Sequence, residues 1–296
     1  MTPIRRQSTL NGPAITAGVE LHGGEHTRLV LKPAPIDSGI VFVRSDVTDR
    51  DNRVVADPDN VSSTRNCTTL RNAAGVEVAT VEHLLAAVAS VGIDNLVIEL
   101  SGREIPALDG SSSPFLDLIE RVGITPQPAA RRYVKVLKSY RVEQGDAWAE
   151  ITPSSRLELD VSIDFDDAAI GESRLRFVPD ERCFREDISR ARTFARKSDI
   201  EPLKRAGLGK GASLDNAVLV DGSAVVNPEG LRYADEFVRH KVLDLMGDLY
   251  LGGPVIGHVR THKGGHALNH ALMTEVYADP QGWRFEGLPI PDMATA

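Results

Sequence analysis

The sequence predicts an α+β fold in two domains, on three observations. Stretches typical of strands and of helices are mixed along the chain, without the regular alternation that a parallel α/β sheet requires. The length of 296 residues is enough to bury one large core or two ordinary ones. Pro126 and Pro128 interrupt the pattern and indicate a linker. We therefore expect an N-terminal domain over residues 1–125, a linker over 126–132 and a C-terminal domain over 133–296.

The N-terminal domain is expected to begin with strands and to contain two helices. Its strands are indicated by β-branched and apolar residues between turn residues, over 27–32, 40–44 and 95–100. A helix is predicted over 80–91, because apolar residues recur there at helical spacing, with Thr80 as its cap and Gly92 at its end. A loop rich in glycine and serine then leads into a short helix over 115–122.

The C-terminal domain is expected to mix strands and helices in the same way. Strands are indicated over 133–137, 148–151, 157–165 and 255–259, and a β pair over 217–220 and 225–226. Helices are predicted over 180–191, from 235 to a stop at Gly252, and over 267–277. Residues 207–211 resemble a phosphate-binding loop only weakly, because the required strand and helix do not flank them. A flexible loop near a substrate is the better interpretation.

Composition excludes several classes of protein. The formal charge of −8 and the pI of about 5.5 argue against a nucleic-acid groove or an anionic membrane surface. Cys67 and Cys183 are the only cysteines, too few for a disulfide framework, and we expect them to be reduced. The first residues lack the apolar core of a signal peptide, and no apolar run is long enough to span a membrane. The expected location is the cytoplasm.

Residues 235–248 contain the most informative spacing in the chain. His240, Asp244 and Asp248 follow one another at four-residue intervals, so a helix would stack them on one face. A histidine and a carboxylate one turn apart can bind the same cation, and His83, in a Glu-His pair, is the best source of a third ligand. The same spacing also fits a solvated helix face, and the residues alone leave both interpretations open.

Four histidines recur at every fourth position, at His258, His262, His266 and His270. They cannot form one helical stripe, because glycines interrupt the segment. We expect His258 and His262 on one side of a strand and His266 at the start of the next helix, with Asp248 as the carboxylate that offsets its charge. His258, His262 and His270 are interpreted as structural.

Six segments together resemble one family, in order and over nearly the whole chain: 80–84, 92–95, 109–111, 189–194, 235–244 and 265–269. The sequence is similar to the UDP-3-O-acyl-N-acetylglucosamine deacetylases, zinc enzymes of lipid A biosynthesis in Gram-negative bacteria. The resemblance implies two α+β domains of similar topology, each a β-sheet packed on a pair of helices, with the active site between them. Two residues depart from the family pattern: Glu20 replaces a usual glycine, where it is expected to alter the pocket near the acyl chain, and His270 replaces a common asparagine.

The resemblance also implies the site residues and a cofactor, one catalytic Zn²⁺. Its ligands would be His83, His240 and Asp244, which leaves the fourth position open as in catalytic zinc sites. Glu82 would be the general base, and His266, oriented by Asp248, would assist the departing amine. Thr193 and Lys241 would support the developing oxyanion.

The substrate implied by the resemblance is a UDP-sugar that carries a fatty acyl chain. Phe165 would pack on the uracil, and Lys241 with nearby arginines would be candidates for the diphosphate. An insert over 194–219 would form the acyl passage, with apolar or small residues at Phe194, Ile200, Leu203, Leu208, Ala212, Ser213, Ala217 and Leu219. Bulk at Ser213 or Ala217 is expected to block this passage.

Two other functions fit the sequence less well. A zinc peptidase would use similar chemistry, but the sequence has no His-Glu-x-x-His motif. A non-catalytic binding module would not need Glu82, His266 and Lys241 together. Another zinc amidohydrolase that acts on a related acylated amide is the alternative that stays open. The working unit is expected to be a monomer, without nucleic acid and without a membrane span.

Overall fold

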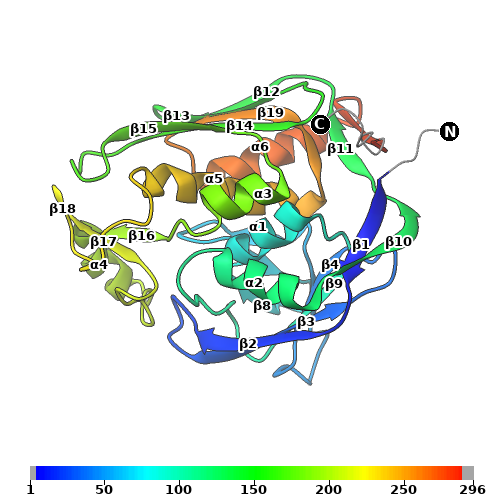
Figure 1. The fold of residues 1–296 in the computed structure, drawn as a ribbon, viewed down its shortest axis with the longest axis horizontal. Coiled ribbons are helices and arrows are strands. Elements are labelled where there is room, and N and C mark those ends of the chain that lie inside the picture. Colours follow the sequence, from blue (N-terminus) through cyan, green and yellow to red (C-terminus); the bar gives the residue numbers. More distant parts are fainter. Residues whose placement is uncertain (1–4, 289–296) are drawn as a thin grey trace.

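The structure is a computed structural model that describes residues 5–288. Figure 1 shows a β-sheet on each outer side of the molecule and the main helices between the two sheets. The predicted α+β class is confirmed, since strands and helices are mixed in both halves of the chain. Within the described residues, no helix combines the length and the apolar character that a membrane crossing requires.

The first half of the chain builds a five-stranded sheet. In spatial order its strands are β2 (Ala14–Val19), β3 (His26–Pro33), β9 (Leu96–Leu100), β4 (Ile40–Arg44) and β5 (Arg53–Val55). β4 and β9 run parallel, and the other neighbours are antiparallel. The three strands predicted here are confirmed as β3, β4 and β9. A smaller sheet beside it consists of β6 (Val61–Ser63), β7 (Thr69–Arg71) and β8 (Glu77–Ala79).

Two helices cover the inner face of this sheet, α1 (Glu82–Val91) and α2 (Ser113–Val122). Gly92 ends α1 in the left-handed conformation, as predicted. The predicted cap is wrong. Thr80 makes no capping bond; it has a φ of 58°, and its hydroxyl donates to the buried Glu104 carboxylate at 2.7 Å. The hydroxyl of Thr80 therefore bonds to the buried Glu104 carboxylate and not to the free backbone N–H groups at the start of α1.

The second half builds a seven-stranded sheet around one long central strand, β19 (Val255–His262). Its other strands are β11 (Tyr133–Val136), β12 (Tyr140–Gln144), β13 (Ala147–Thr152), β14 (Leu157–Asp164), β15 (Glu172–Phe177) and β20 (Trp283–Glu286). β19 pairs with β13 in antiparallel fashion and with β11 and β14 in parallel fashion. The predicted strands are present, and β12, β15 and β20 were not predicted.

The helices of the second half lie on the inner face of its sheet (Figure 1). They are α3 (Glu181–Cys183), which continues as a π-helical turn, η2 (Phe184–Ile188), then α5 (Glu236–Leu249) with a 3₁₀ turn, η3 (Tyr250–Gly252), and α6 (His266–Ala278). The predicted helices are therefore confirmed in position. His258 and His262 lie on β19 and His266 begins α6, also as predicted.

The insert has more structure than the sequence indicated. β16 (Phe194–Arg196), β17 (Val218–Asp221) and β18 (Ala224–Val225) form a three-stranded sheet, and α4 (Lys197–Arg205) follows β16. The helix α4 was not predicted, because it has no fully buried residue and contains Pro202. Figure 1 shows this sheet and α4 at one end of the molecule, beside the helices.

The two halves share a single hydrophobic core rather than two separate ones. α1 and α5 form the most extensive helix–helix contact of the described residues. The segment predicted as a linker lies largely in β10 (Ile124–Ala130), which pairs with β1 (Arg6–Leu10). The domain limits given by the sequence stay a prediction.

Candidate metal centre and active site

The site forms where α1 and α5 meet. Gly247 of α5 faces the backbone of α1 so closely that an added Cβ would lie 2.0 Å from the carbonyl oxygen of Glu82. Only glycine permits this approach. The contact brings the first turn of α1, with Glu82 and His83, opposite the middle of α5, with His240 and Asp244.

The three predicted ligands, His83, His240 and Asp244, lie together and are buried. Their ligand atoms all lie within 4.8 Å of one another. The Oδ1 atom of Asp244 is 3.6 Å from Nε2 of His83 and 3.4 Å from Nε2 of His240. These separations suit atoms arranged around one ion.

The chemistry of these donors fits a metal ion. Oδ1 of Asp244 is buried without a hydrogen-bond partner, which is costly for a carboxylate oxygen unless a cation occupies the space. Nδ1 of His240 is 3.1 Å from the carbonyl oxygen of Ala191. Because a carbonyl can only accept, Nδ1 carries the hydrogen and the lone pair on Nε2 is free for a metal.

Burial lowers the pKa of His240 to about 3, although Asp244 acts in the opposite direction. The imidazole is therefore neutral, as a ligand must be. Burial alone would raise the pKa of Asp244, but the charge of Lys241 holds it well below its usual range. Lys241 donates from Nζ to Oδ2 of Asp244 at 2.9 Å, which leaves Oδ1 free.

A second group of side chains lies beside the ligands. Nδ1 of His266 is 2.8 Å from Oδ2 of Asp248, and its Nε2 is 3.7 Å from Oε1 of Glu82. Thr68 connects the two carboxylates, because its backbone N–H donates to Glu82 at 3.1 Å and its hydroxyl donates to Asp248 at 2.6 Å. Asn269 donates to Asp248 as well, at 2.9 Å.

This arrangement raises the pKa of both catalytic candidates, His266 and Glu82. Burial lowers the pKa of His266, but Asp248 and Glu82 outweigh it and raise the pKa to about 10. His266 is therefore cationic at neutral pH and can donate a proton. Burial also raises the pKa of Glu82, to about 8, although His266 opposes this shift. The predicted pairing of His266 with Asp248 is present in the structure.

A cavity of about 400 Å³ opens next to these groups. Its polar lining includes Glu82, His83, Thr193, His240, Lys241, Asp244 and His266. Thr193 is held there by its backbone, which donates to the carbonyl of Gly110 at 2.8 Å. Phe165, Phe194, Pro202, Leu203, Ala212 and Ala217 supply most of its apolar lining.

The structure separates the residues predicted for the acyl passage into two groups. Phe194, Leu203, Ala212 and Ala217 line the cavity, and Ile200, Leu208, Ser213 and Leu219 do not. For Ile200 the reason is the unpredicted helix, since α4 turns Asp199, Pro202 and Leu203 toward the cavity and Ile200 to another side. Ser213 is exposed.

The match to a family model covers residues 7–278 and is described as UDP-3-O-acyl N-acetylglycosamine deacetylase. The chain belongs to this family. A UDP-3-O-acyl-N-acetylglucosamine deacetylase of Phenylobacterium zucineum is 44% identical over 279 residues, which are 94% of this chain and 95% of that protein. The enzymes of the same name from Shewanella pealeana and Pasteurella multocida are 46% and 44% identical, over 94% and 95% of this chain and 91% and 92% of their own lengths.

In this member of the deacetylase family, several residues of the cavity were missed from the sequence. They are Leu21, His22, Arg65, Asn66, Thr80, Ala195, Arg196, Asp199, Pro202 and Gly209. Most lie on loops, where no periodic pattern marks them. Glu20 was expected to alter the pocket, but it does not line the cavity; its buried carboxylate accepts from the hydroxyl of Thr27 and the backbone of Glu104.

Proposed function

We propose that this protein is a zinc-dependent deacetylase that acts on UDP-3-O-acyl-N-acetylglucosamine. It hydrolyses the acetamide to give UDP-3-O-acyl-glucosamine and acetate, the committed step of lipid A biosynthesis. The relatives of nearly equal length carry this name. The proposal keeps two expectations from the sequence, a cytoplasmic location and a single chain as the working unit.

One observation carries the proposal. The buried Nε2 atoms of His83 and His240 lie 3.6 and 3.4 Å from the unpartnered Oδ1 of Asp244. A separate carboxylate–histidine pair, Glu82 and His266, lines the same cavity. A structural metal site needs only ligands, whereas a hydrolytic site also needs a base and an acid. When bound, a zinc ion would supply Lewis acidity to the amide carbonyl and to the attacking water, and its charge would favour the ionised form of Glu82.

The side chains divide the proton transfers between them. Glu82 would take a proton from the water as its oxygen adds to the acetyl carbon. His266 would give its proton to the nitrogen as the C–N bond breaks, and the water oxygen stays on acetate. Asp248 accepts from Nδ1 of His266, so the proton available for transfer is on Nε2, toward Glu82 and the cavity. Lys241 and Thr193 line the same cavity, where they would support charge on the carbonyl oxygen.

The deciding experiment measures acetate release together with metal content. The purified protein should contain about one equivalent of zinc and release acetate from UDP-3-O-acyl-N-acetylglucosamine, and the apo form should regain activity on addition of Zn²⁺. The titration starts from the apo form, because excess zinc can occupy the open position. Substrates without the uridine diphosphate test the alternative, another zinc amidohydrolase of acylated amides. If they react as fast as the nucleotide sugar, the alternative replaces this proposal.

Phe165 is predicted to bind the uracil. It follows β14, lines the cavity and is only partly buried, with its ring centroid 5.7 Å from that of Phe194. Phe165→Ala should raise KM roughly tenfold, in line with the ~1 to 3 kcal/mol of base–aromatic stacking. Phe285→Ala is the control, because Phe285 is 54% exposed and does not line this cavity. Lower thermal stability with an unchanged KM would instead make Phe165 an ordinary core residue.

Ala217 is predicted to lie in the acyl passage. A tryptophan there fills space that the chain would occupy, and each displaced methylene costs about 0.8 kcal/mol, or about fourfold in kcat/KM. Ala217→Trp should therefore reduce kcat/KM for the acylated substrate on the order of a hundredfold and leave zinc content intact. Ser213→Trp, which the sequence alone placed in the passage, becomes the matched control because Ser213 is exposed. Equal effects of the two variants, or equal rates for UDP-N-acetylglucosamine without its acyl chain, would contradict the passage.

A further inference from the structure

Arg192 is an almost fully buried arginine that the proposed mechanism does not use. Its exposed fraction is 1%, and that of its partner Glu236, in the first turn of α5, is 0%. A buried guanidinium is stable only if its donors are satisfied and its charge is balanced. Arg192 directly precedes the cavity residue Thr193, and Glu236 lies on the helix that carries His240, which suggests what the pair does.

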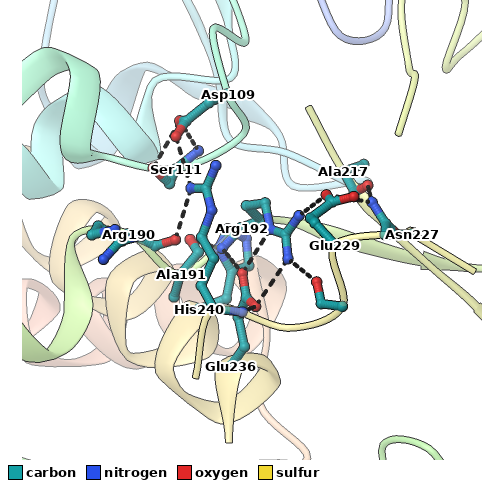
Figure 2. A network of polar contacts seen from close by, with 12 residues as sticks. Asp109, Ser111, Arg190, Ala191, Arg192, Ala217, Asn227, Glu229, Glu236 and His240 are labelled. Carbon is teal, nitrogen blue, oxygen red and sulfur yellow. Dashed lines mark hydrogen bonds and ion pairs between the residues drawn. The ribbon is translucent and has the colours of Figure 1, made fainter. Parts of the chain in front are cut away.

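Figure 2 shows the contacts of Arg192. Nε donates to Oε1 of Glu236 at 2.9 Å, and Nη2 donates to Oε2 at 3.2 Å and to the carbonyl of Gly230 at 2.7 Å. Nη1 donates to Glu229 at 2.6 Å. The guanidinium therefore donates to two carboxylates and one carbonyl. Its planar group binds Glu236 through two nitrogens at once, which the ammonium of a lysine could not do with the same geometry.

The backbone of the same segment binds α5 at two successive turns. The N–H of Arg192 donates to Oε1 of Glu236 at 2.9 Å, and the carbonyl of Ala191, one residue earlier, accepts from Nδ1 of His240 at 3.1 Å. Glu236 and His240 are four residues apart, so they lie on one face of the helix. The segment Ala191–Arg192 is thus fixed in register on α5 by two hydrogen bonds, one from each residue. The bond from Ala191 orients the candidate metal ligand His240 (Figure 2).

We infer that Arg192 and Glu236 are positioning residues for the metal centre, which act by holding the Ala191 carbonyl against Nδ1 of His240. This inference rests on the proposed metal site. Without the pair, the segment loses one of its two attachments to α5, and the His240 ring loses the partner that fixes its tautomer and its orientation. The pair acts on metal affinity through His240 and does not touch the substrate.

A second attachment ties the segment to the first half of the chain. The guanidinium of Arg232 donates to Asp109 at 2.7 Å and to the carbonyl of Arg190 at 3.0 Å, and Asp109 accepts in turn from Ser111. The backbone N–H of Arg232 donates to Oε2 of Glu236 at 2.6 Å. Glu236 therefore accepts hydrogen bonds both from Arg192 and from Arg232. Its replacement should affect the metal centre at least as much as replacement of Arg192.

Arg192→Lys and Glu236→Gln test the inference. The lysine keeps the positive charge beside Glu236 but lacks the planar group, and the glutamine keeps the shape of the glutamate without its charge. Arg131→Lys is the matched control, because Arg131 is also a buried arginine, donates from Nε to Asp94 at 2.9 Å and from Nη2 to Tyr250 at 2.8 Å, and lines no part of the metal cavity. All three variants should lose thermal stability, so stability alone does not decide.

The readouts are the affinity for Zn²⁺, measured by competition with a chelator on folded protein, and the visible spectrum of the Co²⁺-substituted form. Arg192→Lys and Glu236→Gln should weaken Zn²⁺ binding about tenfold to a hundredfold, as loss of such partners does at other sites, and alter the cobalt spectrum. Arg131→Lys should leave both unchanged. Wild-type affinity in Arg192→Lys and Glu236→Gln, or equal loss in Arg131→Lys, would overturn the inference alone. Failure of the wild-type protein to bind Zn²⁺ would overturn the proposed metal site and this inference with it.

Discussion

Glu82→Gln is expected to abolish most turnover and to leave the metal centre assembled. The amide is nearly isosteric with the carboxylate, and its oxygen can still accept from the backbone of Thr68. It cannot take a proton from water. Loss of a general base costs about 10²- to 10⁴-fold, and we expect kcat to fall by this factor with KM little changed.

Three measurements on the Glu82→Gln protein separate the base from a structural role: zinc content, substrate KM and kcat. Zinc content close to that of the wild type shows that His83, the adjacent ligand, is still in place. Thr68→Val is a comparison variant, because valine keeps the backbone N–H that donates to Glu82 and removes the hydroxyl that donates to Asp248. Near-normal kcat in Glu82→Gln would remove Glu82 from the role of base.

His240→Ala should lose metal and activity together. It removes one of three ligands and leaves Oδ1 of Asp244, already without a hydrogen-bond partner, with one fewer neighbour that could share a cation. The loss of Zn²⁺ affinity should exceed the roughly hundredfold that removal of an outer partner costs. The measurement is metal content after dialysis, followed by acetate release with and without added Zn²⁺.

His262→Ala is the matched control for His240→Ala. His262 lies at the end of β19, where its Nδ1 is 3.0 Å from the hydroxyl of Ser162, and it does not belong to the metal cluster. It should keep the wild-type metal content. Full activity of the wild-type protein after exhaustive chelation would contradict a metal mechanism as a whole.

The sequence was most informative where chemistry repeats at the period of a helix. The spacing of His240, Asp244 and Asp248 is enough by itself to place them on one face of α5, and the Glu-His pair that supplies His83 stands out in an apolar helix. The α+β class followed from the mixed order of strands and helices. These features depend on local periodicity, which a single sequence carries directly.

What the sequence missed depends on contacts between distant segments. Thr68 lies outside any predicted element, and only the fold brings its hydroxyl to Asp248, 180 residues away. Ile200 and Leu203 were equally apolar in the sequence, and the direction of α4 decides that only Leu203 reaches the cavity. Thr80 was predicted as a helix cap from its position before the helix. The prediction failed because its hydroxyl donates instead to Glu104, in a segment that no local pattern connects to Thr80.

The close approach of α1 and α5 at Gly247 limits how the molecule can move. His83 belongs to one half of the chain and His240 and Asp244 to the other, and the helices that carry them touch backbone to backbone. A hinge opening between the halves would pull the ligands apart and expose the shared core. The three candidate ligands are therefore held in one fixed arrangement by the α1–α5 contact, and a movement that admits a molecule to the cavity without separating them has to take place outside this contact.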